Sequence, residues 1–140
     1  MVYLAQTDTT IGLLSKSQRL LNIIKKRPSS KSCIFCATSF GEITPRVPNN
    51  CKKFARRAKK TTFALQNGFS FRIVKDSMHA MFLRKTGALY STSANLTKES
   101  FDIDFAKQTA DIIVEDFRGF FENKPSAIIK MGQKKLKKIR

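Results

Sequence analysis

Two spacings of apolar residues recur along the chain, and they separate the expected strands from the expected helices. Short alternating runs rich in β-branched and aromatic residues indicate strands, whereas apolar residues three and four positions apart indicate an amphipathic helix. The pattern predicts strands over residues 2–7, 32–38, 61–66, 69–74, 88–92, 111–115 and 126–131. It predicts helices from residue 15 or 17 to about 26, over 49–60, from 76 or 77 through 85, and over 104–109.

Turn and cap residues support these boundaries. Asn67-Gly68 separates two alternating runs and favours a two-residue hairpin turn. Gly87 stands in the usual place of a helix C-cap, and Pro28 ends the first helix because proline disfavours helical backbone in the residue before it. The order of elements predicts a single α/β domain over residues 1–140, with one twisted, mixed open sheet flanked by helices.

The first expected helix is amphipathic. Its apolar positions Leu20, Leu21, Ile23 and Ile24 are expected to share the buried face. The polar residues of the same stretch, which include Asn22 and Lys25, are then expected to lie elsewhere on the helix.

Charge is the unusual bulk property of this sequence. The chain has 27 Lys plus Arg against 10 Asp plus Glu, a formal net charge of +17 over 140 residues. Such a field favours polyanions, which include nucleotide phosphates, RNA and anionic membrane surfaces. The sign of the charge does not choose among these ligands, and a lysine-rich surface also serves solubility alone.

The remaining composition restricts the function classes. No apolar run is long enough to span a bilayer, and the first residues lack the basic region of a signal peptide, so we expect a cytoplasmic protein that does not use a membrane. Cys33 and Cys36 form a C-x-x-C motif on an expected strand, where their side chains diverge. With Cys51 and a single histidine as the remaining soft ligands, buried structural thiols are favoured over a zinc site.

The candidate chemistry lies in three clusters of hydroxyl and cationic residues. No nucleophile motif or Walker loop is present, and His79 falls in an apolar helix where a packing role is favoured. The clusters are Thr7-Asp8-Thr9-Thr10, Lys25-Lys26-Arg27-Pro28 and Ser91-Thr92-Ser93-Ala94-Asn95. Two of them follow expected strands, where open α/β sheets form ligand crevices. Each alone is typical of a turn or a cap, but together they favour a site for phosphate, carboxylate or amine groups.

The ordered set of clusters resembles the YrdC/TsaC family. That family's opening P-T-D-T-x-Y-G-L is matched by residues 6–13, its K-x-R-P by residues 25–28, and its T-S-A-N-L without change by residues 92–96. Weaker matches are Thr62, Arg72, Ser126 and Arg140. The chain departs from the pattern at Gln6, Ile11, 58–60, Val74 and Lys98.

The resemblance implies a YrdC-like sheet with a basic concave cleft, and an enzyme that forms L-threonylcarbamoyladenylate and pyrophosphate from L-threonine, bicarbonate and ATP with Mg²⁺. The product would pass to the t6A-transfer machinery that modifies tRNA. Lys25 and Arg27 would be the catalytic residues. By correspondence, ATP would be bound by Lys25, Arg27, Ser91, Ser93, Asn95, Ser126 and Arg140. Threonine would be bound by Thr9, Lys31, Thr62, Arg72 and Ser93.

Two alternatives remain open at this point. One is a protein on the same scaffold that binds double-stranded RNA or tRNA without adenylation activity, through Lys52, Lys53, Arg56, Arg57, Lys59, Lys60, Lys134, Lys135, Lys137 and Lys138. The other is a related enzyme that carbamoylates an acceptor other than threonine. A sheet edge exposed near the N-terminus would favour a homodimer, so both a monomer and a homodimer are considered.

Overall fold

The computed structural model describes residues 1–94, 102–121, 124–132 and 136–139. Within these residues the helices are α1 (Gln18–Ile24), α2 (Asn49–Arg57), α3 (Ser77–Thr86) and α4 (Ile103–Thr109), with a 3-10 turn over Phe40–Glu42. The strands are β1 (Tyr3–Gln6), β2 (Ile11–Ser15), β3 (Ile34–Ala37), β4 (Thr61–Ala64), β5 (Ser70–Ile73), β6 (Leu89–Ser93), β7 (Ile112–Val114), β8 (Ala127–Met131) and β9 (Leu136–Lys138).

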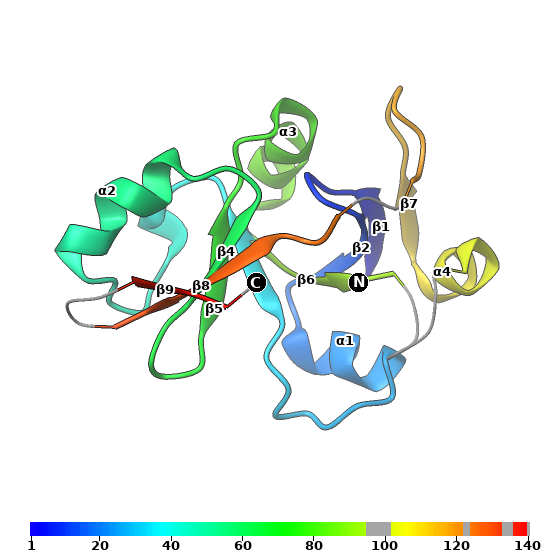
Figure 1. Ribbon diagram of the computed structural model, residues 1–140. Coiled ribbons are helices and arrows are strands. Elements are labelled where there is room, and N and C mark those ends of the chain that lie inside the picture. The colour runs from blue at the N-terminus through cyan, green and yellow to red at the C-terminus, as the bar shows by residue number, and fades with distance from the viewer. Residues whose placement is uncertain (95–101, 122–123, 133–135, 140) are drawn as a thin grey trace.

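The described strands form one mixed sheet in the order β7-β1-β2-β6-β3-β5-β4-β8-β9 (Figure 1). The pairs β1–β7, β3–β5 and β4–β8 are parallel, and the other neighbours are antiparallel. The predicted α/β class with a mixed, helix-flanked sheet is confirmed. The expected exposed edge near the N-terminus is wrong, because β1 lies between β7 and β2.

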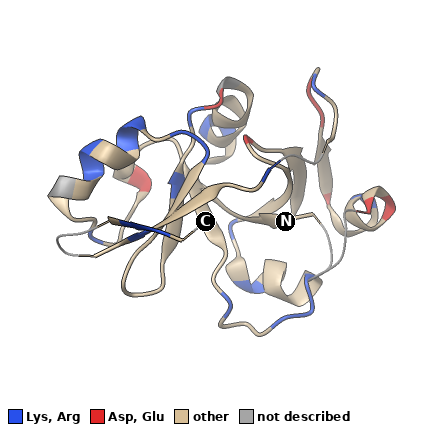
Figure 2. Cartoon of the chain, in the orientation of Figure 1, with Lys and Arg blue, Asp and Glu red and all other residues tan. Residues whose placement is uncertain are grey.

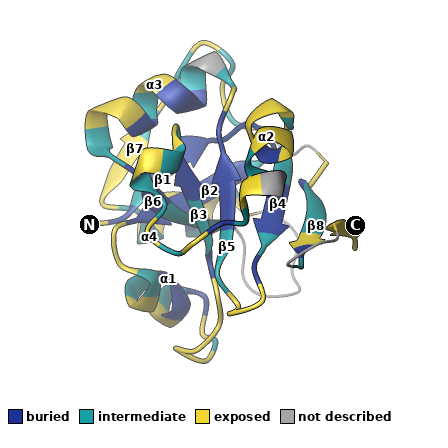
Figure 3. Cartoon of the chain, turned by 90° about the vertical axis from the view of Figure 1, so that its left-hand side faces the viewer, coloured by how far each residue is buried: buried dark blue, intermediate teal, exposed yellow. Residues whose placement is uncertain are grey.

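Neighbouring residues of the inner strands face opposite layers of the core. Leu13 belongs to a buried cluster with Leu21 of α1 and Ala106 of α4, whereas Leu14 belongs to another cluster with Leu83 of α3. Accordingly, α1 and α3 lie on opposite sides of the sheet (Figure 1). Helix α2 contributes to a third cluster, with β4, β5 and β8. The middle strands are buried between these layers, and the helices expose their outer faces (Figure 3).

Local signals account for several element boundaries. Ser17 accepts a hydrogen bond from the backbone of Leu20 and caps α1, and Asp76 caps α3 in the same way. Gly87 ends α3 with a φ of 81°, a conformation that glycine adopts without strain. The predicted hairpin joins β4 and β5, but its loop has three residues rather than two, because Leu65 still pairs with Phe69.

Two strands escaped the sequence pattern. Strand β2 is buried along its whole length, so it shows no alternation between apolar and polar positions. Strand β9 is a short basic segment that pairs with β8, and its own residues carry no strand pattern. Both strands are defined by their neighbours in the sheet rather than by local preference.

The exposed and buried faces of α1 also differ from the prediction. Asn22 is fully buried and Lys25 is 3% exposed, whereas Ile23 is 61% exposed. The helix is only seven residues long, so its orientation follows the loop after it and the strands beneath it rather than its own apolar stripe. Two polar side chains are therefore carried into the interior beside the loop that follows α1.

The cysteines match the expectation of buried structural thiols. Cys33, Cys36 and Cys51 are buried thiols, and Cys33 and Cys36 belong to different core clusters, as the strand geometry predicted. No helix in the described part of the chain is both long enough and apolar enough to cross a membrane.

Candidate ligand-binding site

A cavity of about 360 Å³ lies where the β1–β2 turn, the loop after α1, the end of β6 and the segment before β8 meet. Three cations, Arg27, Lys31 and Arg72, line it together with many hydroxyl groups. Within the described residues no carboxylate lines this cavity. Its chemistry therefore suits an anionic ligand. The full lining is Thr7, Thr9, Thr10, Gly12, Arg27, Lys31, Ser32, Cys33, Ile34, Arg72, Ser91, Thr92, Ser93, Pro125, Ser126 and Ile128.

The tight turn between β1 and β2 presents the hydroxyls of the T-D-T-T cluster. The Thr7 side chain accepts hydrogen bonds from the backbone N–H groups of Thr9 and Thr10, and the Thr7 backbone N–H donates to the Thr10 carbonyl at 3.0 Å. These bonds satisfy the turn locally. They fix Thr7, Thr9 and Thr10 at the wall of the cavity.

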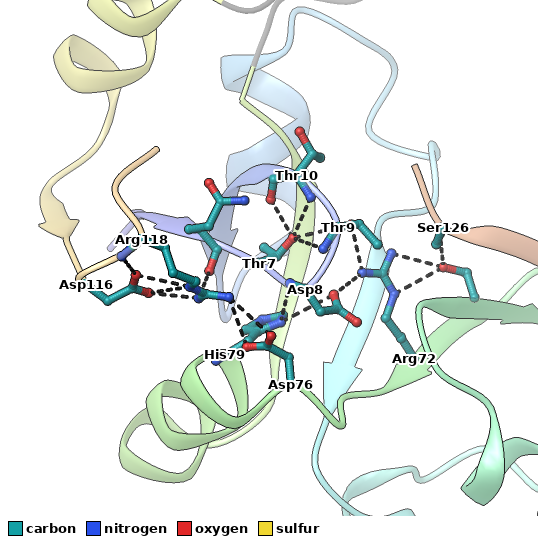
Figure 4. Close-up of polar contacts among 12 residues, drawn as sticks. Thr7, Asp8, Thr9, Thr10, Arg72, Asp76, His79, Asp116, Arg118 and Ser126 are labelled. Atoms are coloured by element: carbon teal, nitrogen blue, oxygen red, sulfur yellow. Dashed lines mark hydrogen bonds and ion pairs between the residues drawn. The ribbon is translucent and has the colours of Figure 1, made fainter. Parts of the chain in front are cut away.

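Arg72 is held from two sides (Figure 4). One terminal nitrogen donates to the Asp8 carboxylate at 2.6 Å and to the Thr9 hydroxyl at 3.2 Å. Its Nε and other terminal nitrogen donate to the Thr62 hydroxyl at 3.4 and 3.2 Å, and that hydroxyl is 2.7 Å from the hydroxyl of Ser126. Because its partners come from two separate segments, the β1–β2 turn and β4, the guanidinium has a single fixed orientation at the cavity.

Asp8 is the buried counter-charge of Arg72. Its side chain is 3% exposed, and His79 Nδ1 lies 3.5 Å from the same carboxylate oxygen that contacts Arg72. Burial by itself would raise the pKa of Asp8, but the hydrogen bond with His79 and the charge of Arg72 outweigh it and lower that pKa to about 2. Asp8 is therefore ionised at neutral pH.

His79 lies in the interior, in contact with the Asp8 member of this ion pair. It is 1% exposed, and its Nδ1 accepts from the backbone N–H of Asp8 at 3.3 Å. Its Nε2 is buried without a hydrogen-bond partner among the described residues. The predicted buried position on α3 is confirmed, and the contact with Asp8 adds a polar role to it.

Arg27 lines the cavity, and Lys25 lies next to a lining residue, Ser93. Lys25 Nζ donates to the Ser93 carbonyl at 3.0 Å and to the Ser93 hydroxyl at 3.3 Å, so the K-x-R loop touches the end of β6. Burial, helped by the charge of Arg27, lowers the pKa of Lys25 to about 8. Arg27 donates to the Asn22 side-chain oxygen at 2.6 Å and to the Cys33 sulfur at 3.1 Å.

Gly12 lies in the floor of the cavity. A Cβ at this position would approach the Thr7 methyl group to 2.9 Å and the Ser91 hydroxyl to 3.2 Å. The close contact between β2, the T-D-T-T turn and β6 therefore depends on the absence of a side chain at Gly12.

Most residues of the expected site come together. Thr9, Arg27, Lys31, Arg72, Ser91, Ser93 and Ser126 line the cavity. Lys25 and Thr62 contact lining residues through hydrogen bonds. The expected contacts Asn95 and Arg140 lie outside the described residues. The ligand roles of all these residues remain predictions.

The expected RNA contacts lie away from this cavity. Lys52, Lys53, Arg56 and Arg57 are on α2, Lys59 and Lys60 precede β4, and Lys137 and Lys138 are on β9. Lys134 and Lys135 are outside the described residues. Lys and Arg gather on α2 and β9 at one end of the molecule, and acidic residues gather around α4 and β7 at the other (Figure 2).

The sequence patterns did not assign several residues that shape the site. Asp8 stood inside the T-D-T-T motif without a role, and its position as the single acid among hydroxyls was the available signal. Asn22, Cys33 and His79 gave no such signal, because each meets its partner only in the folded chain.

A larger cavity of about 570 Å³ lies elsewhere, between the β4–β5 turn, the start of α2 and the end of β8. Arg46 is the only charged side chain that lines it in the described part of the chain. The smaller cavity contains the clustered cations and hydroxyls, so we regard it as the candidate site.

Comparison with known proteins agrees with this fold. No protein-family model matches the chain. Sua5 from P. abyssi in complex with L-threonine aligns with a TM-score of 0.79 and 15% identity, covering 99% of this chain and 49% of that one. E. coli YciO aligns with a TM-score of 0.75 and 18% identity, covering 99% and 82% of the two chains. The chain has the YrdC-like fold.

Two further likenesses extend this result. Full-length HypF in a phosphate- and nucleotide-bound form aligns with a TM-score of 0.77 and 13% identity, covering 99% of this chain and 26% of that one. A Mycoplasma pneumoniae protein named Uncharacterized protein MG259 homolog is 28% identical over 147 residues, covering 97% of this chain and 31% of the relative. The chain thus spans about a third of the length of this curated relative.

Proposed function

We propose that the chain is an L-threonylcarbamoyladenylate synthase, which uses L-threonine, bicarbonate and ATP and releases pyrophosphate. The observation that carries the proposal is the meeting of the K-x-R loop, the end of β6 and Arg72 around one cavity. The motif resemblance names the same three segments. The structure of Sua5 with L-threonine and that of HypF with phosphate and nucleotide support a ligand of each kind on this fold.

The proposed reaction needs positioning and positive charge more than a strong base. The threonine amine and bicarbonate form a carbamate with loss of water. A carbamate oxygen then attacks the α-phosphorus of ATP, and the bond to the β-phosphate breaks as pyrophosphate leaves. Lys25 and Arg27 are proposed to stabilise the charge on the phosphates during this step.

The part of the cavity beside Arg72 is proposed to hold threonine. Arg72 would bind its carboxylate, with Thr9 beside it, because the bond to Asp8 already orients the guanidinium. Ser93 contacts Lys25 and lines the cavity, so it is proposed to contact both ligands. This arrangement would bring the carbamate toward the phosphates of ATP.

We propose that Mg²⁺ enters with ATP and is held mainly by the phosphates. Across the described residues no group of three or more His, Cys, Asp or Glu side chains is placed to hold a metal ion. The cavity also lacks carboxylates within that part of the chain. Both observations favour a nucleotide-borne ion over a protein cage.

The direct test is pyrophosphate release by the purified protein from ATP and Mg²⁺, with and without L-threonine and bicarbonate. Release that requires both supports the synthase. Arg27→Ala should lower turnover about 10- to 100-fold, because it removes one phosphate contact. Lys53→Ala on α2 is the matched control, since it removes the same charge from an exposed position outside the cavity lining. Equal turnover in the two variants would refute the role of Arg27.

A second candidate function is RNA binding without adenylation. It is favoured by the basic end of the molecule, where exposed Lys53 and Arg57 on α2 and exposed Lys137 on β9 gather (Figure 2). We expect double-stranded RNA affinity to fall steeply with salt, and the combined Lys53→Ala and Arg57→Ala change to reduce the salt slope by about 1 to 2. An unchanged slope would remove this surface from consideration.

A further inference from the structure

The loop that carries Lys25, Arg27 and Lys31 begins with a specific helix ending. Helix α1 stops at Ile24, and Lys26 takes a left-handed conformation with a φ of 53°. The Lys26 N–H donates to the Ile23 carbonyl at 3.1 Å, and the Arg27 N–H donates to the Asn22 carbonyl at 3.1 Å. These two bonds are those of a Schellman motif. They turn the chain back so that Arg27 lies beside Asn22.

The Asn22 side chain then binds three points of the returning loop. Its Nδ2 donates to the Ser29 carbonyl at 3.2 Å and to the Lys31 carbonyl at 2.8 Å. Its Oδ1 accepts from Arg27 Nε at 2.6 Å. Both amide hydrogens are thus used on the loop backbone, and the oxygen is used on a cation of the cavity.

We propose that Asn22 is the positioning residue of this loop and holds Arg27 and Lys31 at the anion-binding cavity. The proposal rests on the proposed function for the identity of the anion, ATP. Asn22 is fully buried, and a buried amide is tolerated only when its hydrogen bonds are made. As a donor, the Asn22 side chain bonds to the Ser29 and Lys31 carbonyls and, within the described residues, to no group of α1. The residue therefore holds the loop rather than the helix.

Cys33 is a second hydrogen-bond acceptor for the Arg27 side chain. Arg27 donates a second hydrogen bond to the Cys33 sulfur at 3.1 Å, and the Cys33 thiol lies 3.7 Å from the Asn22 oxygen. The guanidinium is thereby fixed between Asn22 and the start of β3. Asn22 does not line the cavity, so it acts on the anion through Arg27 and Lys31.

The test is ATP binding measured by calorimetry on the whole chain, with Asn22→Leu as the first variant. Leucine has the same branched shape and number of side-chain heavy atoms as asparagine and is also uncharged, so it removes the loop bonds without changing the net charge. We expect ATP to bind about tenfold more weakly, because the variant loses the buried hydrogen bonds that Asn22 makes to Arg27 and to the loop carbonyls. Leu21→Val is the matched control on the same buried face of α1, and it should lower the melting temperature and leave ATP affinity unchanged.

A double-mutant cycle with Arg27→Ala separates positioning from general destabilisation. If Asn22 acts through Arg27, Asn22→Leu should cost at most about threefold in the Arg27→Ala background. A full tenfold loss in both backgrounds overturns the coupling. Should Asn22→Leu fail to fold, Asn22→Asp keeps the acceptor for Arg27 and loses both donors, and wild-type ATP affinity in that variant overturns the proposal.

The outcome is separable from that of the proposed function. Threonine-dependent pyrophosphate release by the wild type tests the synthase, whereas ATP binding tests Asn22. Weaker ATP binding in Asn22→Leu, in a chain that releases no pyrophosphate, supports the positioning role and rejects the synthase. A wild-type chain that binds no ATP rejects the positioning role as stated.

Discussion

The buried pair of Asp8 and Arg72 gives the sharpest test of the structure. Asp8→Asn keeps the size of the side chain and one acceptor oxygen but removes the charge that faces Arg72 at 2.6 Å. Both side chains are nearly inaccessible, at 3% and 6% exposure. Removing one partner of such a pair costs about 3–5 kcal/mol, and the retained acceptor places the expected loss near 3 kcal/mol at pH 7.

The pH dependence of this loss follows from the pKa of Asp8. That pKa is lowered from 3.8 to about 2 in the folded chain. A lowered carboxyl pKa contributes stability that is fully present above the unfolded value and disappears as the pH falls through the folded value. A shift of nearly two pH units corresponds to about 2 kcal/mol. The gap in unfolding free energy between wild type and Asp8→Asn should therefore narrow from about 3 to about 1 kcal/mol between pH 5 and pH 2.

Urea unfolding followed by circular dichroism at several pH values measures this gap. Asp104→Asn, which changes an exposed carboxylate on α4, is the matched control and should retain the wild-type pH dependence. A gap between wild type and Asp8→Asn that stays constant from pH 5 to pH 2 would contradict this prediction, because it would mean that the Asp8 carboxylate is not stabilised by Arg72 and His79 in the folded chain.

Three further predictions concern the loop after α1 and the cavity. Because burial lowers the pKa of Lys25 to about 8, its charge is lost as the pH rises, and ATP affinity measured by calorimetry should fall about tenfold by pH 9. The Lys25→Arg variant stays charged and should lose this pH dependence. The same fall in affinity in both proteins would contradict the assignment to Lys25. Lys26→Gly should stabilise the chain by about 1 kcal/mol, because glycine adopts the left-handed conformation of this position freely. Lys26→Ala should not stabilise it, so equal unfolding free energies for the two variants would contradict the prediction. Gly12→Ala should destabilise the fold by about 1–3 kcal/mol in urea unfolding through its contact with Thr7, and wild-type stability would show that the turn relaxes without cost.

Much of the architecture follows from local sequence. The capping oxygen of Asp76, the left-handed glycine at Gly87 and the turn at Asn67-Gly68 each act within a few residues, so the helix and hairpin that they bound were predictable. The loop of the hairpin has one residue more than predicted, because the pairing of Leu65 with Phe69 sets its length. The ordered motifs likewise indicated which segments carry the candidate site.

Tertiary contacts decided the rest. Strand β2 is buried on both faces, and β9 consists of one leucine followed by two lysines, so neither shows the alternation that marks a half-buried strand. The burial of Asn22 and the exposure of Ile23 shift the buried face of α1 from the predicted one, because hydrogen bonds to the returning loop outweigh the apolar pattern of one short helix.

The candidate site, too, is determined partly by local sequence and partly by the folded chain. Sequence alone determined that hydroxyl and cationic residues occur in three clusters, two of them after strands. Only the folded chain brings Asp8 to Arg72, 64 positions away, and to His79, 71 positions away. Contacts of this range depend on the order of strands in the sheet, which short-range preferences do not encode, and they set both the orientation of Arg72 and the charge of Asp8.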